Sequence, residues 1–103
     1  FDLGVTDVII DPGFGFGKSL ECNYMLLNNM AQLRVGNLPL LAGISRKSMI
    51  NKVLDTKPEE ALNGTSTLHL MALQQGANLL RVHDVKEAKE VIKLFQYSNS
   101  IRC

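Results

Sequence analysis

The chain has 103 residues, of which 46% are hydrophobic and 20% charged, a composition typical of a folded domain. Eleven basic and ten acidic residues give a net charge of +1, which provides no reason to expect a nucleic-acid or membrane-surface partner. The two cysteines lie in no Cys/His cluster, which argues against a disulfide framework and a structural zinc site. The apolar runs are too short to cross a bilayer. We therefore expect a reduced, cytoplasmic protein.

Short apolar runs predict buried β-strands, and amphipathic patterns between them predict helices. The strands are expected at 5–10, 38–42 and 78–83, where apolar runs are bounded by Gly, Pro or Asn. Apolar residues spaced three or four apart predict helices over about 20–36, 45–54, 58–75 and 84–96. The pattern ends there, so residues 97–103 are expected to form a loose tail.

Three polar residues are interpreted as structural. Asp84 and Glu87 have the spacing of a capping box at the start of the last helix, where each would accept from a free backbone amide. His69 lies in mid-helix with no acid or cysteine at ligand spacing, so we expect it to be a packing or surface residue.

The order of these elements predicts the α/β class. Apolar strands separated by helices are typical of a parallel sheet with helices on its outer face. A doubly wound sheet and a (β/α)8 barrel both satisfy this order, and periodicity does not choose between them. Because the chain begins at Phe1 within an expected element, we interpret it as part of a longer protein.

Charged and hydrogen-bonding residues follow each expected strand at its carboxyl end. Residues 11–18 read Asp-Pro-Gly-Phe-Gly-Phe-Gly-Lys, residues 43–48 read Gly-Ile-Ser-Arg-Lys-Ser, and residues 81–84 read Arg-Val-His-Asp. In both candidate folds, ligands bind at the carboxyl ends of parallel strands. We therefore expect the three segments to line one site.

The glycine-rich loop does not match a nucleotide-binding motif. A Walker A loop would need glycine in place of Pro12, and a Rossmann fingerprint would need it in place of Lys18. A simple tight turn would explain the glycines alone. It does not explain Asp11, whose carboxylate can accept two donors from a heterocycle with an amino group beside a ring N–H. Phe14 and Phe16 are expected to supply flat walls for such a ring.

The other two segments carry groups suited to anions. Ser45 and Ser48 lie at an expected helix start, where free N–H groups favour an anion, although an ordinary serine cap would look the same. Arg81 and His83 share one side of a strand, because side chains alternate along it with a period of two. An arginine in an apolar strand needs an acid or a phosphate, so a structural Arg–carboxylate pair is the alternative reading.

Taken together, these segments resemble three successive signatures of the dihydropteroate synthase family. The matching stretches are 11–18, 43–48 and 80–85, and the likeness extends to about Gln96. The family is a (β/α)8 TIM barrel. The resemblance therefore implies that residues 1–103 are the C-terminal part of a single pterin-binding barrel domain, containing strands 6–8 and their helices.

The resemblance implies roles for five residues on the pterin side of the site. Asp11 would bind the amino-pyrimidine edge, Gly15 would lie against the ring, and Lys47 would hydrogen-bond the pterin beside the reaction centre. Arg81 would cover the pterin face and reach phosphate, and His83 would help to hold the leaving pyrophosphate. Lys47, Arg81 and His83 are thus the residues expected to act in catalysis.

For the second substrate, the resemblance implies that Phe16 borders 4-aminobenzoate and that Ser45 and Ser48 bind its carboxylate. The implied reaction condenses 6-hydroxymethyl-7,8-dihydropterin pyrophosphate with 4-aminobenzoate, giving 7,8-dihydropteroate and pyrophosphate in folate biosynthesis. Mg²⁺ is the expected cofactor, with its ligand in the missing N-terminal half and none in this chain. A homodimer is expected for the full-length protein, and the isolated fragment is expected to be inactive.

Two other functions compete with this interpretation. A corrinoid-type pterin-binding methyltransferase is also a barrel with a carboxylate at the pterin edge, but it has no need for a pyrophosphate site at Arg81 and His83. A degenerate barrel fragment that serves only in binding or dimerisation is the non-enzymatic alternative.

Overall fold

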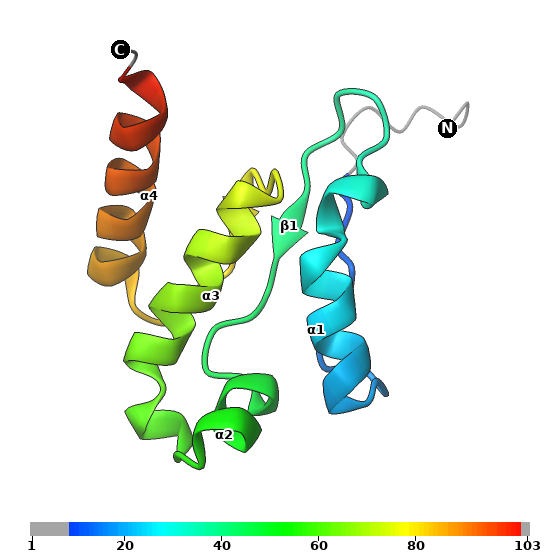
Figure 1. Ribbon diagram of the computed structural model, residues 1–103, viewed down its shortest axis with the longest axis vertical. Helices are drawn as coiled ribbons and strands as arrows, with labels where there is room; N and C mark the ends of the chain where they lie inside the picture. The colour runs from blue at the N-terminus through cyan, green and yellow to red at the C-terminus, as the bar shows by residue number, and fades with distance from the viewer. Residues whose placement is uncertain (1–8, 102–103) are drawn as a thin grey trace.

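The computed structural model describes residues 9–101, in which helices alternate with short parallel strands (Figure 1). The helices and strands in chain order are α1 (Leu20–Asn28), β1 (Leu41–Ala42), α2 (Ser48–Leu54), α3 (Leu62–Gln74), β2 (Leu79–Leu80) and α4 (Val85–Ser100). Two 3-10 helices, η1 (Met30–Leu33) and η2 (Pro58–Glu60), precede β1 and α3. Within residues 9–101, no helix has both the length and the apolar character that crossing a membrane requires.

Parallel pairing joins the strands in sequence order. β1 pairs with β2, with Leu41 opposite Leu79, and Ile10 forms a parallel bridge with Leu40. Three consecutive segments of the chain therefore run side by side in the same direction. This confirms the predicted α/β class and the parallel arrangement of the segments.

The ladder is shorter than the apolar runs predicted, with two residues in each of β1 and β2. Before β2, the Leu40 N–H donates to the Asn78 side chain instead of to a backbone carbonyl. After β2, the Arg81 N–H still donates to the Ala42 carbonyl, at 3.1 Å, before the chain turns into α4. Residues 5–8 of the first expected strand lie outside the described residues.

The helices lie beside the strands and enclose one core. Figure 1 shows α4 beside α3 and the β1 segment between α3 and α1, with α2 across the end toward which β1 points. The largest fully buried hydrophobic side chains come from the glycine-rich loop, α1, η1, the β1 segment and α2, and they are Phe14, Leu27, Met30, Leu40, Ile44, Met49 and Ile50. The loops that follow the strands thus emerge together at the α2 end.

Two helices are interrupted where local hydrogen bonds favour another conformation. The first ends at Asn28, and the Asn29 side-chain amide donates to the Met25 carbonyl as the chain tightens into η1. The helix expected from Pro58 starts as the 3-10 turn η2 and becomes α-helical only after Ala61. Side chains that bond to their own backbone commonly end or delay helices in this way.

The C-terminal helix is longer than predicted. α4 continues to Ser100, whose hydroxyl donates to the Tyr97 carbonyl at 2.7 Å, so the prediction of a loose tail is wrong for residues 97–100. The apolar stripe does end near Gln96, but no Gly or Pro follows it. Because each added residue of a formed helix gains one backbone hydrogen bond, the helix propagates beyond the stripe.

His69 is a packing residue, as the sequence predicted. Its side chain lies on α3 with 2% exposure, and its Nε2 has no hydrogen-bond partner among the described residues. Burial lowers the pKa of His69, so its ring is neutral at neutral pH. His69 thus belongs to the core rather than to a binding site.

Close approach of α2 and α3 depends on Gly64. A β-carbon at Gly64 would lie 3.0 Å from Leu54 Cδ1 and in hard contact with Ile50 Cγ2. Real β-carbons essentially never approach side chains that closely, so the two helices would have to separate.

Replacing Gly64 with alanine is expected to destabilise the fold. Overpacking of this kind costs about 1–3 kcal/mol, which outweighs the gain in helix propensity of about 1 kcal/mol. Denaturant unfolding of the protein that carries this chain would measure the change. Asn63→Ala, at an exposed position one residue earlier, is the control and should leave stability nearly unchanged. A Gly64→Ala protein as stable as the parent would disprove the close contact.

Candidate active site

Asp11 and Arg81 face each other across the end of β1. Asp11 follows Ile10, Arg81 follows β2, and the carboxylate Oδ2 lies 3.6 Å from the guanidinium Nη2. Gly43, which follows β1, lies between them, since a β-carbon there would be 3.6 Å from the Arg81 guanidinium. The three strand ends therefore meet on one surface. Asp11 and Arg81 lie at its sides, and Gly43, which has no side chain, lies between them.

Lys47 extends over the same surface. Its Nζ donates to the Phe14 carbonyl at 2.7 Å and lies 5.2 Å from the centre of the Phe16 ring. A β-carbon on Gly43 would lie 3.6 Å from this Nζ, as it would from Arg81. Asp11, Lys47 and Arg81 thus converge, as the sequence predicted for the three loops.

The electrostatic environment favours deprotonation of Lys47. Partial burial lowers the pKa of Lys47, and the neighbouring positive charges of Arg81 and Lys18 lower it further, while the Asp11 carboxylate opposes the shift. Among residues 9–101, Lys47 therefore has two cationic neighbours and one acidic neighbour. Such an excess of positive charge suits a ligand that carries negative charge.

The glycine-rich loop is shaped by positive backbone angles and by side chains that bind its backbone. Gly13 and Gly15 have φ of 74° and 86°, which favour glycine. The Asp11 carboxylate accepts from the Gly13 N–H at 2.9 Å, and Lys18 Nζ donates to the Gly13 carbonyl at 2.8 Å. From α1, the buried Asn23 accepts from the Gly15 N–H at 2.8 Å.

The two phenylalanines of this loop have opposite environments. Phe14 is 1% exposed and belongs to the core, whereas Phe16 is 70% exposed. Phe16 is thus exposed, as a ligand-contacting ring must be. The prediction that Phe14 forms a second flat wall is wrong, because its ring is buried and anchors the loop to the core. An open depression of about 220 Å³ is lined by Phe14, Gly15, Phe16, Lys47 and Ser48.

Ser45 and His83 form a second polar contact beside the site. The Ser45 hydroxyl lies 2.8 Å from His83 Nδ1 and accepts from the His83 backbone N–H at 3.3 Å. Ser45 is 5% exposed, whereas Ser48 is exposed at the first residue of α2. The two serines, which were predicted to bind one carboxylate together, therefore have different surroundings.

Asp84 does not cap α4 with its side chain, so the predicted capping box is wrong. Its carboxylate accepts two hydrogen bonds from Arg46 instead, at 3.0 Å from Nε and 2.9 Å from Nη2. Hydrogen bonds from Arg46 lower the pKa of Asp84. A charged, bidentate donor competes successfully with neutral backbone amides for the same carboxylate.

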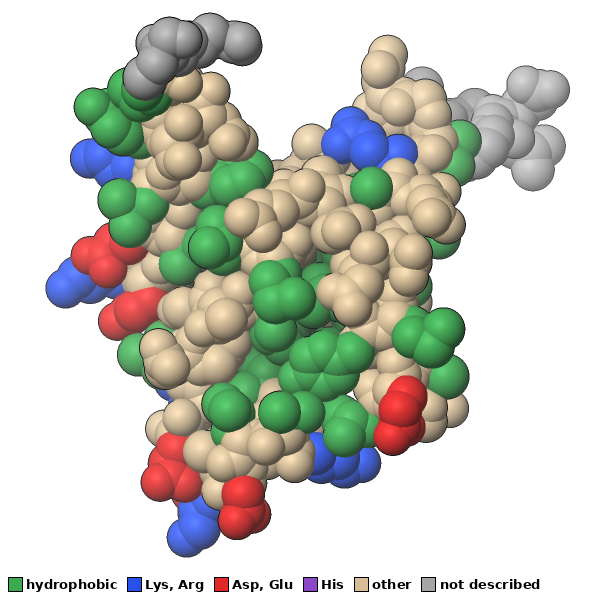
Figure 2. Space-filling view, in the orientation of Figure 1, with side chains coloured by type: hydrophobic (Ala, Val, Ile, Leu, Met, Phe, Trp, Pro, Cys, Tyr) green, Lys and Arg blue, Asp and Glu red, His purple; other side chains and the backbone are tan. Residues whose placement is uncertain are grey.

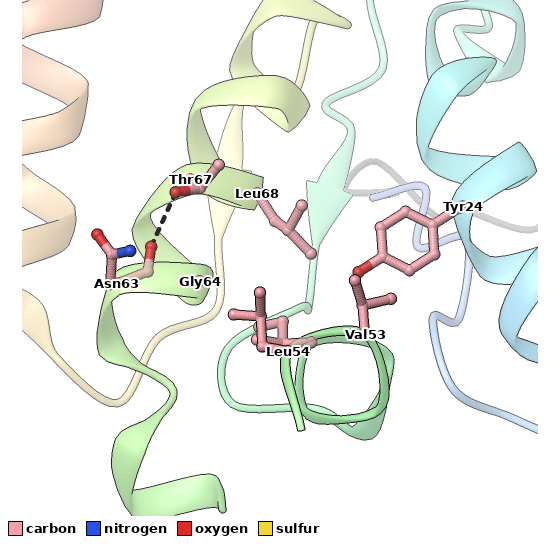
Figure 3. Close-up of a pocket in the computed structure, with 8 residues that line it drawn as sticks. Tyr24, Val53, Leu54, Asn63, Gly64, Thr67 and Leu68 are labelled. Carbon is pink, nitrogen blue, oxygen red and sulfur yellow. Dashed lines mark hydrogen bonds between the residues drawn. The ribbon is translucent and has the colours of Figure 1, made fainter. Parts of the chain in front are cut away.

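A second cavity lies between the helices, away from these charged residues. It has a volume of about 250 Å³ and is lined by Tyr24, Ile50, Val53, Leu54, Asn63, Gly64, Thr67 and Leu68. Figure 3 shows Tyr24 of α1 facing Val53 and Leu54 of α2, with Leu68 of α3 above them. The lining includes no charged side chain and none of the predicted site residues.

Comparison with known proteins agrees with the convergence of Asp11, Lys47 and Arg81. A family model described as a pterin binding enzyme matches residues 1–83. The chain belongs to that family. In pterin-binding enzymes the shared feature is recognition of a flat heterocycle, which suits a surface with a carboxylate and an exposed aromatic ring.

The relatives of this chain are longer than it is. The dihydropteroate synthase of Escherichia coli K12 is 46% identical over 95 residues, which is 92% of this chain and 34% of that protein. The bifunctional dihydropteroate synthase/dihydropteroate reductase of Helicobacter pylori is 44% identical over 92 residues, or 89% of this chain and 24% of that protein. The chain thus spans about a quarter to a third of these curated relatives.

Solved structures of similar proteins share the fold of the described residues. The Yersinia pestis dihydropteroate synthase is 43% identical with a TM-score of 0.87, and the match covers 90% of this chain and 38% of that one. The Xanthomonas albilineans enzyme in complex with 7,8-dihydropteroate is 41% identical with the same TM-score of 0.87, covering 91% and 36%.

Several residues that shape the candidate site were not predicted from the sequence. Asn23 and Lys18 hold the glycine-rich loop, and Arg46 and Asp84 join the loops that follow β1 and β2. Asn23 belongs to no motif, and Arg46 lies in the 43–48 stretch without a predicted role, so only the tertiary contacts identify what they do. Asp84 has the spacing of a capping box with Glu87, so the sequence pointed to a local role and not to Arg46.

The environment of Lys47 predicts an early loss of its proton. Because the neutral form is favoured in the folded state, the midpoint for labelling by an amine-reactive reagent should lie below the ordinary lysine value of about 10.4. The unfolded chain holds this proton to higher pH, so Lys47 makes folding more favourable as pH rises through its folded pKa. Peptide mass spectrometry after labelling across a pH series would measure the midpoint.

Two substitutions test the cause of the Lys47 shift. Arg81→Ala should raise the midpoint, because it removes a neighbouring positive charge, and Asp11→Asn should lower it. Lys89, which is exposed on α4, provides the internal control. A Lys47 midpoint equal to that of Lys89 in all three proteins would contradict the proposed environment.

Proposed function

We propose that this chain forms part of a dihydropteroate synthase, which joins 6-hydroxymethyl-7,8-dihydropterin pyrophosphate to 4-aminobenzoate and releases pyrophosphate. The observation that carries the proposal is the convergence of Asp11, Lys47 and Arg81 at neighbouring strand ends. Membership of the pterin-binding family and the names of the relatives support it. The activity belongs to a protein that includes the parts this chain does not span, and we expect the chain alone to be inactive.

We extend the proposal to the fold and place the chain as strands 6–8, with their helices, of a (β/α)8 barrel. Consecutive strands pair in parallel and the helices lie beside them, which both fit a barrel. Leu79 of β2 is 41% exposed, and a strand edge of this kind needs a partner or a cover. A preceding βα unit of the same protein would supply both.

The pterin would lie between Asp11 and Arg81. The Asp11 carboxylate would accept from the amino group and a ring N–H, displacing the 3.6 Å ion pair with Arg81. Arg81 would then be free to cover the ring and to reach a phosphate oxygen, which its 63% side-chain exposure permits. Lys47 would donate to the pterin from the other side, and Gly15 would leave room for the ring.

His83 would contribute to the pyrophosphate side. The contact between the Ser45 hydroxyl and His83 Nδ1 fixes the ring. When the hydroxyl donates to Nδ1, the Nε2–H is left as the donor that a leaving pyrophosphate needs. Ser45 would therefore act on the histidine as well as near the 4-aminobenzoate carboxylate.

The depression beside Phe16 is suited to 4-aminobenzoate. Phe16 would contact the flat ring with its exposed face, and Ser48 would donate to the carboxylate at the rim. The C–O bond to the pyrophosphate would largely break first, and the substrate amine would then attack the pterin methylene and lose a proton. Charge stabilisation by Arg81 and His83 would favour departure, and Asp11 would favour positive charge on the pterin.

Mg²⁺ is part of the same proposal, with its ligand outside this chain. Among residues 9–101, no group of three His, Cys, Asp or Glu side chains is placed to hold a metal ion. A magnesium ion held by another part of the protein would add positive charge at the pyrophosphate.

A cytoplasmic location is likewise proposed, in keeping with the free thiol of Cys22.

The synthase is favoured over a pterin-binding methyltransferase by Arg81 and His83, because methyl transfer does not release pyrophosphate. Arg81→Ala in a full-length protein that carries this chain should lower kcat/KM for the pterin pyrophosphate by roughly 10- to 150-fold, or about 1.5–3 kcal/mol. Steady-state assay of dihydropteroate formation would measure it.

Arg34→Ala is the matched control for that assay. Arg34 binds the Gly76 carbonyl at the opposite, amino end of the strands, so its loss should not change kcat/KM. Full activity of the Arg81→Ala protein would argue against the pyrophosphate site, and no synthesis by the parent protein would refute the proposed activity.

The full-length protein is proposed to be a homodimer that buries the apolar cavity between α1, α2 and α3. Figure 2 shows hydrophobic side chains gathered between α1 and α3 and above α2. Val53 and Leu54 at this cavity are 57% and 51% exposed. Exposed apolar patches with a polar rim mark protein interfaces.

A charge placed in this patch should separate the subunits. Val53→Glu would bury a carboxylate in an apolar interface, so we expect monomers at concentrations where the parent is dimeric, with dissociation raised roughly 10-fold or more. Light scattering after size-exclusion chromatography would measure the mass. Val35→Glu, at a loop residue of similar exposure, 56%, should remain dimeric. Dimers in both variants would place the interface elsewhere.

A further inference from the structure

Arg46 and Asp84 connect the two loops that carry most of the proposed site. The guanidinium donates to both carboxylate oxygens, at 3.0 and 2.9 Å, and its Nη1 donates to the Pro58 carbonyl at 2.6 Å. The side chains are 22% and 23% exposed, so the pair is largely shielded from solvent. Bidentate Arg–carboxylate pairs fix direction as well as distance.

The backbone of Arg46 has a conformation that L residues seldom adopt. Its φ is 55°, in the left-handed region, and its N–H donates to the Thr65 hydroxyl oxygen at 3.0 Å. Non-glycine residues persist in this region only where surrounding contacts hold them. The side-chain bonds to Asp84 and Pro58 and the backbone bond to Thr65 are such contacts.

The neighbours of both partners in sequence are proposed site residues. Ser45 and Lys47 flank Arg46, and they turn toward His83 and the Phe14 carbonyl respectively. Asp84 directly follows His83. A change in the left-handed turn would therefore move Lys47, while loss of the carboxylate would release the segment that carries His83.

The Asp84 carboxylate pairs with Arg46 instead of capping its own helix, α4. Aspartate is among the preferred residues for capping a helix, yet α4 begins with no side-chain cap from Asp84. The carboxylate is directed across to the loop after β1 instead. This arrangement stabilises the relation between two loops rather than the start of one helix.

We propose that Arg46 and Asp84 are positioning residues, which hold the loop of Lys47 against the loop of Arg81 and His83 in the geometry that the reaction requires. The proposal rests on the proposed synthase function. Arg46 touches neither substrate in this account and acts through Lys47, Ser45 and His83. Breaking the pair should leave a folded protein whose Lys47 amine no longer occupies the site.

The position of Lys47 gives a readout that stability alone does not change. In a full-length protein that carries this chain, Arg46→Ala should release Lys47 toward solvent. Its labelling midpoint should rise toward that of Lys89, because burial is the main cause of its lowered pKa. Arg34→Ala also removes an inter-segment arginine bond, to Gly76 at 2.9 Å, so it controls for general loosening and should leave the Lys47 midpoint unchanged.

Kinetics and a double-mutant cycle complete the test. Arg46→Ala and Asp84→Ala should each lower kcat and raise KM for 4-aminobenzoate, with kcat/KM falling roughly 10- to 100-fold. The double variant should be no worse than the worse single variant, since both changes remove one interaction. Arg46→Lys should recover little of the kcat/KM that Arg46→Ala loses, because an ammonium cannot make the bidentate contact.

The outcomes separate this proposal from the proposed function. Reduced thermal stability with an unchanged Lys47 midpoint and unchanged kcat/KM would make the pair purely structural and overturn the proposal. Additive losses in the double variant would also overturn it. If the parent synthesises no dihydropteroate, the proposed function fails. A shift of the Lys47 midpoint in the Arg46→Ala protein would then still support the loop-holding role, and its absence would reject that role as well.

Discussion

Parallel pairing between consecutive chain segments is the constraint on which the site depends. Because Ile10, β1 and β2 run in the same direction, their carboxyl ends meet at one end of the molecule. Residues separated by about seventy positions in sequence are thereby brought within 3.6 Å, as Asp11 and Arg81 demonstrate. The few ladder hydrogen bonds suffice because α1, α3 and the core behind the strands hold the same register.

The loops beyond the strands are held by polar contacts as well as by burial of Phe14 and Ile44. Asn23 fixes the glycine-rich loop from α1, Ser45 fixes the His83 ring, and Arg46 joins the two remaining segments through Asp84. Each of these contacts is a hydrogen bond with a preferred geometry, so each is directional. Asp11 and the cations near it are thus positioned before any ligand arrives.

The sequence predicted the parts of this arrangement that follow from local patterns. Apolar runs and their order indicated parallel strands, and the charged residues at their ends indicated Asp11 and Arg81. Lys47 was singled out only by the family resemblance. Cross-loop contacts were not predictable, since Arg46 and Asp84 are 38 positions apart and no period links them. The sequence did not predict that α4 extends to Ser100, because hydrophobic periodicity indicates which face of a helix is buried and not where the helix ends.

Phe14 and Phe16 lie two positions apart but tolerate different substitutions, because their environments are opposite. The Phe14 ring fills the core, so most replacements there would lower the amount of folded protein. The Phe16 ring projects into solvent and contributes little to packing. Ligand preference at this site is therefore able to drift through position 16 while the scaffold stays intact, which makes that position a natural starting point for altering substrate selectivity.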